Sequence, residues 1–145
     1  MSKLTGNRVM NGTWGEVWMD SDYVGEAYGC QGKVSFNKED VNFCGQLATD
    51  TKITSTKGTG SLKLYKVSSR MANKIGDNIK KGIDTRFTVI SKLADPDAYG
   101  AERVVYRNVS FDDLILSDWE VAVNGKVEVP FTFTEYEFLD KVVDR

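Results

Sequence analysis

The amino-acid sequence predicts a mainly β protein of the α+β class, an antiparallel β-sandwich or open barrel with one flanking α-helix. Several stretches alternate apolar and polar side chains with a period of two, which is typical of strands buried on one face. Only one stretch has apolar residues at the spacing of an amphipathic helix. The 145 residues, of which 41% are hydrophobic, suit a single domain with its own core.

Residues 1–12 are polar, and we expect them to form an extended arm that is ordered only by contact with another element or subunit. Two strands are predicted next, at residues 13–19 and 23–28. The triplet Asp20-Ser21-Asp22 joins them as a turn whose side chains can bind their own backbone. The second strand is expected to continue into the central pair of strands.

The central pair of predicted strands covers residues 33–38 and 61–67. Each strand has one apolar face that can be buried and one polar face that can meet water. The apolar faces consist of Val34, Phe36, Leu62 and Leu64. Residues 42–60 between the strands are mostly polar, and they are predicted to form a long inter-strand loop. A loop of this length in a compact chain usually has a function or is disordered.

One helix is predicted over residues 68–81. Ser68 or Ser69 is placed to cap its first turn, and Gly82 is placed to end it with a Schellman closure. The face expected to pack on the sheet consists of residues spaced four apart, namely Met71, Ile75 and Ile79.

After the helix, strands are predicted at residues 86–93 and 102–111, separated by a turn at Asp95-Pro96. The strand at 102–111 has apolar residues on both faces. This pattern predicts that one face is buried and that the other meets a partner or a narrow space.

The pair Asn124-Gly125 indicates a hairpin between residues 119–123 and 127–133. A three-residue loop places Val121 opposite Val129 and gathers the apolar side chains on one face, so we expect that loop. The residues after 134 carry apolar side chains, but their pattern favours neither helix nor strand.

Composition argues against several classes of function. The chain has no histidine, so it lacks the usual general base and the usual partner of a nucleophilic serine. Cys30 and Cys44 form no zinc-binding pattern, and two unpaired thiols are expected in a cytosol. A net charge of -2 gives no basic face for tight nucleic-acid binding. No apolar run is long enough to span a membrane, so we do not expect a membrane protein. The missing histidine and the missing metal pattern lead us to expect neither an enzyme nor a cofactor.

Six segments resemble the XkdM-like tail tube proteins of contractile phage tails, PBSX-type defective prophages and R-type bacteriocins. The segments are residues 11–15, 45–52, 64–71, 90–93, 95–103 and 130–136. The resemblance implies a tail-tube fold and a structural role in the inner tube of a contractile tail. Six copies would form a ring, and rings would stack into a hollow conduit.

The resemblance also implies partners and a location. The partners are the tail sheath protein, the tape-measure protein, the baseplate and the tail terminator, with DNA only as non-specific cargo in a phage. The location is a virion tail or bacteriocin particle assembled in the bacterial host cytoplasm.

Two sets of residues are candidates for roles in such a tube. Alternation along the strands gives these candidates for the lumen: Lys33, Ser35, Asn37, Lys63 and Glu128. The long loop gives these candidates for ring stacking: Phe43, Gly45, Gln46, Thr49, Asp50, Thr51 and Lys57.

Two other readings stay open. The first is a monomeric β-barrel that binds a small ligand, with Trp14, Trp18 and Tyr106 as its lining. The second is a hydrolase, which the missing histidine disfavours.

Overall fold

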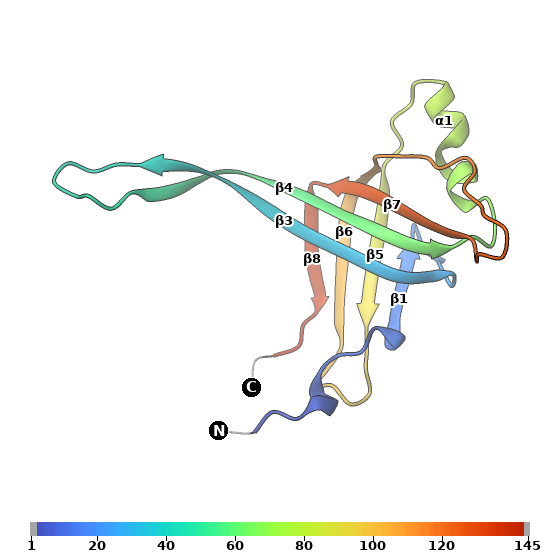
Figure 1. Cartoon of the computed structure of the whole chain (residues 1–145), viewed down its shortest axis with the longest axis horizontal. Coiled ribbons are helices and arrows are strands. Elements are labelled where there is room, and N and C mark those ends of the chain that lie inside the picture. The colour runs from blue at the N-terminus through green and yellow to red at the C-terminus, as the bar shows by residue number, and fades with distance from the viewer. Residues whose placement is uncertain (1–2, 144–145) are drawn as a thin grey trace.

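The computed structural model describes residues 3–143 as two antiparallel sheets packed on each other, with one helical segment at the end of the sandwich (Figure 1). Two short 3-10 helices, Gly6–Arg8 and Gly12–Trp14, precede the first strand. The predicted fold class is confirmed. The first sheet has the order β2-β1-β5-β6-β8 and contains β1 (Gly15–Met19), β2 (Asp22–Tyr23), β5 (Phe87–Leu93), β6 (Glu102–Phe111) and β8 (Glu135–Asp140). The second sheet contains β3 (Ala27–Val41), β4 (Asp50–Tyr65) and β7 (Lys126–Phe133), in the order β3-β4-β7.

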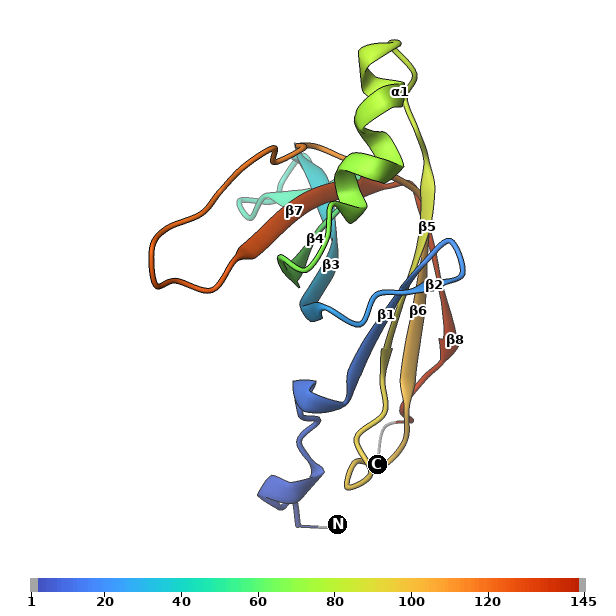
Figure 2. The ribbon, with the colours of Figure 1, turned by 90° about the vertical axis from the view of Figure 1, so that its right-hand side faces the viewer.

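The two sheets are joined where strands pass from one to the other. The end of β6 pairs with β7, and β7 continues into β8 through Thr134 alone. Asn108 adopts a φ of 58° beside this corner, and its Nδ2 donates a hydrogen bond to Thr134 Oγ1 at 3.0 Å. The strands of the two sheets therefore cross at a large angle, as Figure 2 shows.

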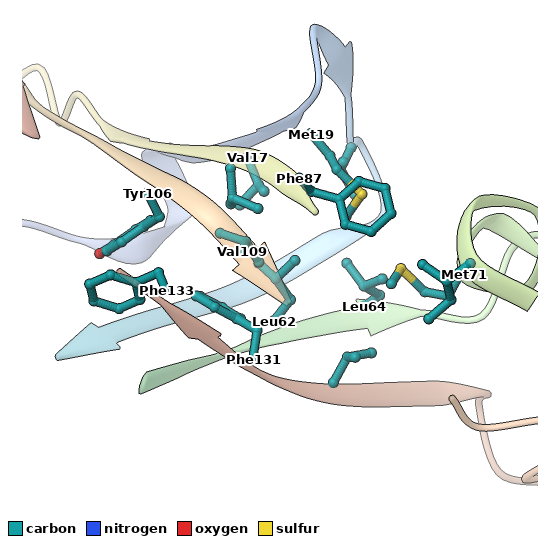
Figure 3. Packing of buried hydrophobic residues seen from close by; sticks show 14 of the residues in the cluster. Val17, Met19, Leu62, Leu64, Met71, Phe87, Tyr106, Val109, Phe131 and Phe133 are labelled. Carbon is teal, nitrogen blue, oxygen red and sulfur yellow. The ribbon is translucent and has the colours of Figure 1, made fainter. Parts of the chain in front are cut away.

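The core lies between the sheets and is rich in aromatic side chains (Figure 3). The side chains that are fully or almost fully buried include Phe131, Met19, Leu62, Val24, Val89, Val109 and Val129. Three further contacts place an aromatic ring directly on a glycine of β3 or β4: Tyr106 on Gly32, Phe133 on Gly58 and Phe131 on Gly60. Burial raises the pKa of the Tyr106 phenol to about 12.

Strands β3 and β4 are longer than predicted. The loop predicted at residues 42–60 is wrong for residues 50–60, which belong to β4. β4 begins at Asp50, so only residues 42–49 connect the two strands. The pairs Val41–Asp50 and Lys33–Thr59 belong to the same ladder, and the register shifts once on the way from one pair to the other, between Asn37 and Lys38. Residues 50–54 have no alternating pattern because this part of the hairpin extends beyond the sandwich and covers no core (Figure 1). We call the projecting part, residues 38–54, the ribbon.

The helical segment confirms most of its prediction. It consists of a π-helical turn (Ala72–Gly76) and α1 (Asp77–Lys80), and Asn73 N–H donates to the Ser69 carbonyl at 2.9 Å. Gly82 has a φ of 76°, and Ile83 N–H donates to the Asn78 carbonyl at 2.8 Å, which is the expected Schellman closure.

The predicted packing face of the helix is correct for Met71 and Ile75, which are buried, and wrong for Ile79, which is 56% exposed. Ile79 lies in α1, the last turn of the helical segment, which extends past the sheets, where no core remains to cover it (Figure 1).

The predicted hairpin between residues 119–123 and 127–133 is wrong. β7 pairs with β4 instead, and this pairing sets Val129 opposite Leu62 and Val127 opposite Leu64. Pairing with β4, which is distant in sequence, buries the apolar side chains of β7 in the core. Pairing with residues 119–123 at the surface would not bury them. Residues 112–125 form an irregular exposed loop. The residues after 134, whose sequence pattern favours neither helix nor strand, contain β8.

Two of the other strand predictions need correction. The strand predicted at residues 13–19 begins at Gly15, and the one predicted at 23–28 is broken by a turn at residues 25 and 26, between β2 and β3. The remaining strand predictions are confirmed. β6 has the predicted bounds, β5 begins one residue later than predicted, and the turn after β1 has positive φ at Asp20 and Ser21. The described part of the amino-terminal arm contacts its own chain: Asn11 N–H donates to Asp95 Oδ2 at 2.9 Å, and Arg8 Nη1 donates to the Asp97 carbonyl at 3.0 Å. Residues 1 and 2 of the arm lie outside the described residues.

An ion pair attaches the start of the helix to the chain before β3. Arg70 Nε donates to Glu26 Oε1 at 2.5 Å, and Arg70 Nη2 donates to Glu26 Oε2 at 3.2 Å. The hydrogen bond from Arg70 holds the pKa of Glu26 below its usual value of 4.5. A carboxylate whose pKa is lowered by folding stabilises the fold at every pH above its usual pKa. This contribution is lost as the pH falls through the lowered pKa of the folded state.

We expect Glu26→Gln to lower the urea midpoint at about pH 7, with a smaller difference from the native chain at about pH 3. Urea unfolding followed by tryptophan fluorescence at both pH values measures this. Asp84→Asn is the control, because the pair of Asp84 with Arg86 is exposed on both sides and is expected to contribute little. An equal deficit for Glu26→Gln at both pH values would contradict the ion-pair assignment.

Candidate functional site

One face of the second sheet is polar and exposed, and it gathers all five residues predicted for the lumen. The β-ladder sets Lys63 opposite both Gly29 of β3 and Glu128 of β7. Residues directly opposite each other share a face, and β3 keeps its alternation from Gly29 to Asn37. The predicted lumen residues on this face are Lys33, Ser35, Asn37, Lys63 and Glu128, all of them exposed.

This polar face is more basic than predicted. Lys57 lies on it, because β4 places Lys57 opposite Ser35. Lys57 therefore sits over the sandwich and not in the connection assigned to ring stacking. Lys126 also reaches the face, with its Nζ 5.6 Å from the ring centre of Tyr28 and 6.0 Å from that of Tyr65. The face carries four lysines and one glutamate.

The other residues predicted for ring stacking lie at the far end of the ribbon. Four of them, Phe43, Gly45, Gln46 and Thr49, are in the exposed connection 42–49. Asp50 and Thr51 are the first two residues of β4 and pair with the end of β3. Gly45 has a φ of 79°, a left-handed conformation that suits glycine at a turn.

Two strand edges of the second sheet lack a partner within residues 3–143. β3 is the last strand of its sheet, so its outer edge is free along its length. On the other side, β6 pairs with β7 only at Phe131 and Thr132, and Pro130 accepts a hydrogen bond from Asp112 N–H. The residues of β7 before Pro130 leave the rest of that edge open. Long free edges invite pairing with another chain.

A cleft of about 550 Å³ separates the sheets where β1 and the start of β3 fail to pair. Its lining includes Val17, Cys30, Ser91 and Leu93. Burial raises the pKa of the Cys30 thiol, while a hydrogen bond with Ser91 works in the opposite direction. The sandwich is thus open along this side.

The predicted lining of a ligand-binding barrel is not assembled. Trp14 is half exposed, Trp18 packs on Tyr23 with ring centres 5.0 Å apart, and Tyr106 packs on Phe133 at 4.8 Å. None of the three predicted residues lines the open cleft.

The chemistry available in the described part of the chain is limited. Within residues 3–143, no group of three or more cysteine, aspartate or glutamate side chains is placed to hold a metal ion. Over the same residues, every helix is too short or too polar to cross a membrane. The notable surfaces are therefore a polar sheet face, free strand edges, a ribbon and an exposed apolar loop.

Solved structures with the same fold come from contractile injection systems. A chain of the PVC sheath-tube complex of an extracellular contractile injection system, in the extended state, matches with a TM-score of 0.73 at 8% identity, over 93% of both chains. A chain of the PVC sheath/tube terminator in the extended state matches with a TM-score of 0.71 at 7% identity, over 91% of this chain and 97% of that one. The fold is that of a component of such particles.

The chain belongs to the phage tail tube protein family, because the model of that family matches residues 2–140. A relative, the phage-like element PBSX protein XkdM of Bacillus subtilis (strain 168), is 32% identical over 143 residues, which is 97% of each chain. The resemblance found in the sequence is confirmed. The protein is a structural tail tube protein, a component of a phage tail or contractile particle.

Proposed function

We propose that this protein is the subunit of a contractile-tail inner tube in which six copies form each ring and the rings stack into a conduit. The observation that carries the proposal is the free outer edge of β3 beside an open edge of β7 in the same sheet. Pairing of these two edges between copies extends the sheet, and six copies close it into a barrel without free edges.

The polar face of the second sheet then lines the lumen. Its apolar face is already covered by the first sheet, so only the polar face is available to the conduit. Lys33, Lys57 and Lys63 make this wall cationic. Lysine binds phosphate through charge and not through base identity, so DNA in the lumen would be non-specific cargo.

The ribbon reaches the neighbouring ring, and the tube works with other tail components. The solved neighbours are components of sheath-tube and terminator assemblies, which supports the tail sheath protein and the tail terminator as partners here. The tape-measure protein and the baseplate complete the proposed set, and assembly takes place in the bacterial host cytoplasm. The role is structural and not enzymatic.

The test combines electron microscopy with hydrogen exchange. We expect the purified protein to form sixfold rings and tubes as its concentration rises or when tube fragments are added as seeds. In the soluble subunit, the outward-facing amides of β3 should exchange quickly, and in tubes they should be protected, because edge pairing satisfies them. A protein that remains monomeric with seeds, or tubes whose β3 amides gain no protection, would contradict the proposal.

A further inference from the structure

The loop between β6 and β7 exposes large apolar side chains, and the inference drawn from it rests on the proposed function. Trp119 is 78% exposed, Val121 is 87% exposed and Leu116 is 81% exposed. Single exposed apolar residues are ordinary, but a group of large ones on one loop marks a contact surface. This surface, formed by Leu116, Trp119 and Val121, is called the apolar loop surface.

The apolar loop surface is held in place by its ends. Asp112 N–H donates to the Pro130 carbonyl at 2.9 Å, and Lys66 N–H donates to the Gly125 carbonyl at 2.7 Å. Leu114, which follows the first of these anchors in the chain, is partly buried and packs against the core. The exposed side chains therefore belong to an anchored loop and not to a free tail.

The ribbon tip, residues 42–49, is a second exposed surface with complementary properties. Phe43 is 55% exposed, and Leu47 is fully exposed. No charged residue occurs in this segment. The tip can therefore cover apolar side chains that lie beside Asp118 and Glu120 without bringing a carboxylate against them.

The two surfaces lie at opposite ends of the molecule. Figure 1 has the longest axis horizontal, and it places the ribbon tip at one end and the loop 112–125 at the other. A copy displaced along this axis brings the tip of one molecule to the loop of the next. Such a head-to-tail contact uses two different surfaces and repeats without closing, as a stack of rings requires.

We propose that the ribbon tip of one copy docks on the apolar loop surface of a copy in the next ring. Phe43 and Leu47 lie against Trp119 and Val121 in this contact. Apolar burial drives the contact, and the carboxylates of the loop stay at its rim. Stacking should therefore depend only weakly on salt, unlike a contact made by exposed ion pairs.

The contact can be tested with the cysteine that the tip already carries. Cys44 is exposed at the ribbon tip. In Val121→Cys tubes, mild oxidation should join Cys44 of one copy to the new thiol of another and give a ladder of linked subunits on a non-reducing gel. The ladder should disappear when Cys44→Ser is added. Val9→Cys is the control, because Val9 is 73% exposed but lies on the amino-terminal arm.

A second measurement compares side-chain truncations. Phe43→Ser and Trp119→Ser should each raise the critical concentration for tube growth about tenfold, since aromatic anchors dominate such contacts. The double variant should be little worse than either single one, because the two side chains remove the same contact. Fully additive effects would overturn the proposal.

The outcomes separate this proposal from the proposed function. Tubes in which Val121→Cys links no more than Val9→Cys would overturn the docking contact and leave the tube assignment intact. Linked chains without rings would support the docking contact and overturn the ring model. If the native protein forms no tubes and the Val121→Cys variant gives no linked chains, both are overturned.

Discussion

A subunit in which an Asn-Gly turn replaces the ribbon, residues 38–54, is expected to fold normally and to build no tubes. Asn37 and Ser55 face each other directly in the ladder, so a two-residue turn can close the shortened hairpin there. The sandwich keeps its core, because no residue of the ribbon belongs to the buried cluster. Rings can still close through the β3 edge that remains, while the contact between rings is lost.

Two measurements check this result. Thermal unfolding should give a midpoint close to that of the native subunit, and electron microscopy should show single rings without tubes. The shortened subunit, added in a small amount, should also stop the growth of native tubes at one end. A ring of shortened subunits accepts a ribbon at one end and offers none at the other, so only one end of a native tube should be blocked.

The matched control keeps the ribbon and changes only its charge. Lys38→Ala and Lys52→Ala remove two exposed cations and leave the apolar tip in place. Tubes of normal length are expected from this double variant, because the contact is not carried by the charges. Tubes of normal length from the shortened subunit would instead show that the ribbon does not stack the rings.

The sequence predicts elements well where local chemistry decides the structure. β6 has the predicted bounds, since both of its faces are apolar enough to mark it as a strand. Gly82 ends the helix as predicted, because the left-handed conformation is inexpensive for glycine. The alternation that placed Lys33 and Glu128 on one face also holds, because no bulge interrupts the strands between the compared positions.

The errors occur where distant residues decide. Val121 and Val123 alternate like a strand, but β4 supplies β7 with a partner that buries more apolar surface, so the local hairpin loses. The ribbon is missed for a related reason. Its strands cover no core, so they lack an alternating pattern, and only their pairing with each other defines them as strands. The prediction of Lys57 as a stacking residue is wrong because residues 50–60 belong to β4 and not to a loop, and Gly58 is required by the ring of Phe133 and not by a turn.

The apolar loop surface has a signal in the sequence, but that signal predicts the wrong structure. The pattern of Trp119 and Val121 predicts one side of a hairpin, because apolar residues at a period of two are usually buried. A subunit that is completed by its neighbours breaks this assumption. Its contact residues carry the pattern of a core while lying at the surface of the isolated chain.

Gly60→Val is expected to prevent folding of the subunit. A Cβ atom at residue 60 would lie 2.2 Å from the Gln31 carbonyl oxygen and 2.6 Å from the Phe131 ring. The first contact is with backbone of the neighbouring strand, which cannot move without opening the ladder between β3 and β4. Overpacking a core costs about 1–3 kcal/mol even where side chains can move. A clash with backbone costs more, out of a total stability of about 5–15 kcal/mol.

This expectation is opposite in sign to the one from strand propensity. Valine favours strands and glycine disfavours them, so propensity alone predicts that Gly60→Val stabilises β4. Circular dichroism and the yield of soluble protein decide between the two. Gly60→Ala introduces the same Cβ atom and should also lower the yield of folded protein. Gly6→Val is the control, since nothing lies within 4 Å of a Cβ atom at residue 6.

A second glycine shows which part of the clash is decisive. At residue 58 the three atoms nearest to a Cβ atom all belong to the Phe133 ring, the nearest of them at 2.5 Å. Phe133→Leu should therefore recover part of the stability lost in Gly58→Ala, because the smaller side chain makes room. Phe131→Leu should not recover Gly60→Val, because the Gln31 carbonyl stays in place. Recovery in both cases would mean that β3 can move away from β4, and that the sheet proposed to line the tube is not rigid.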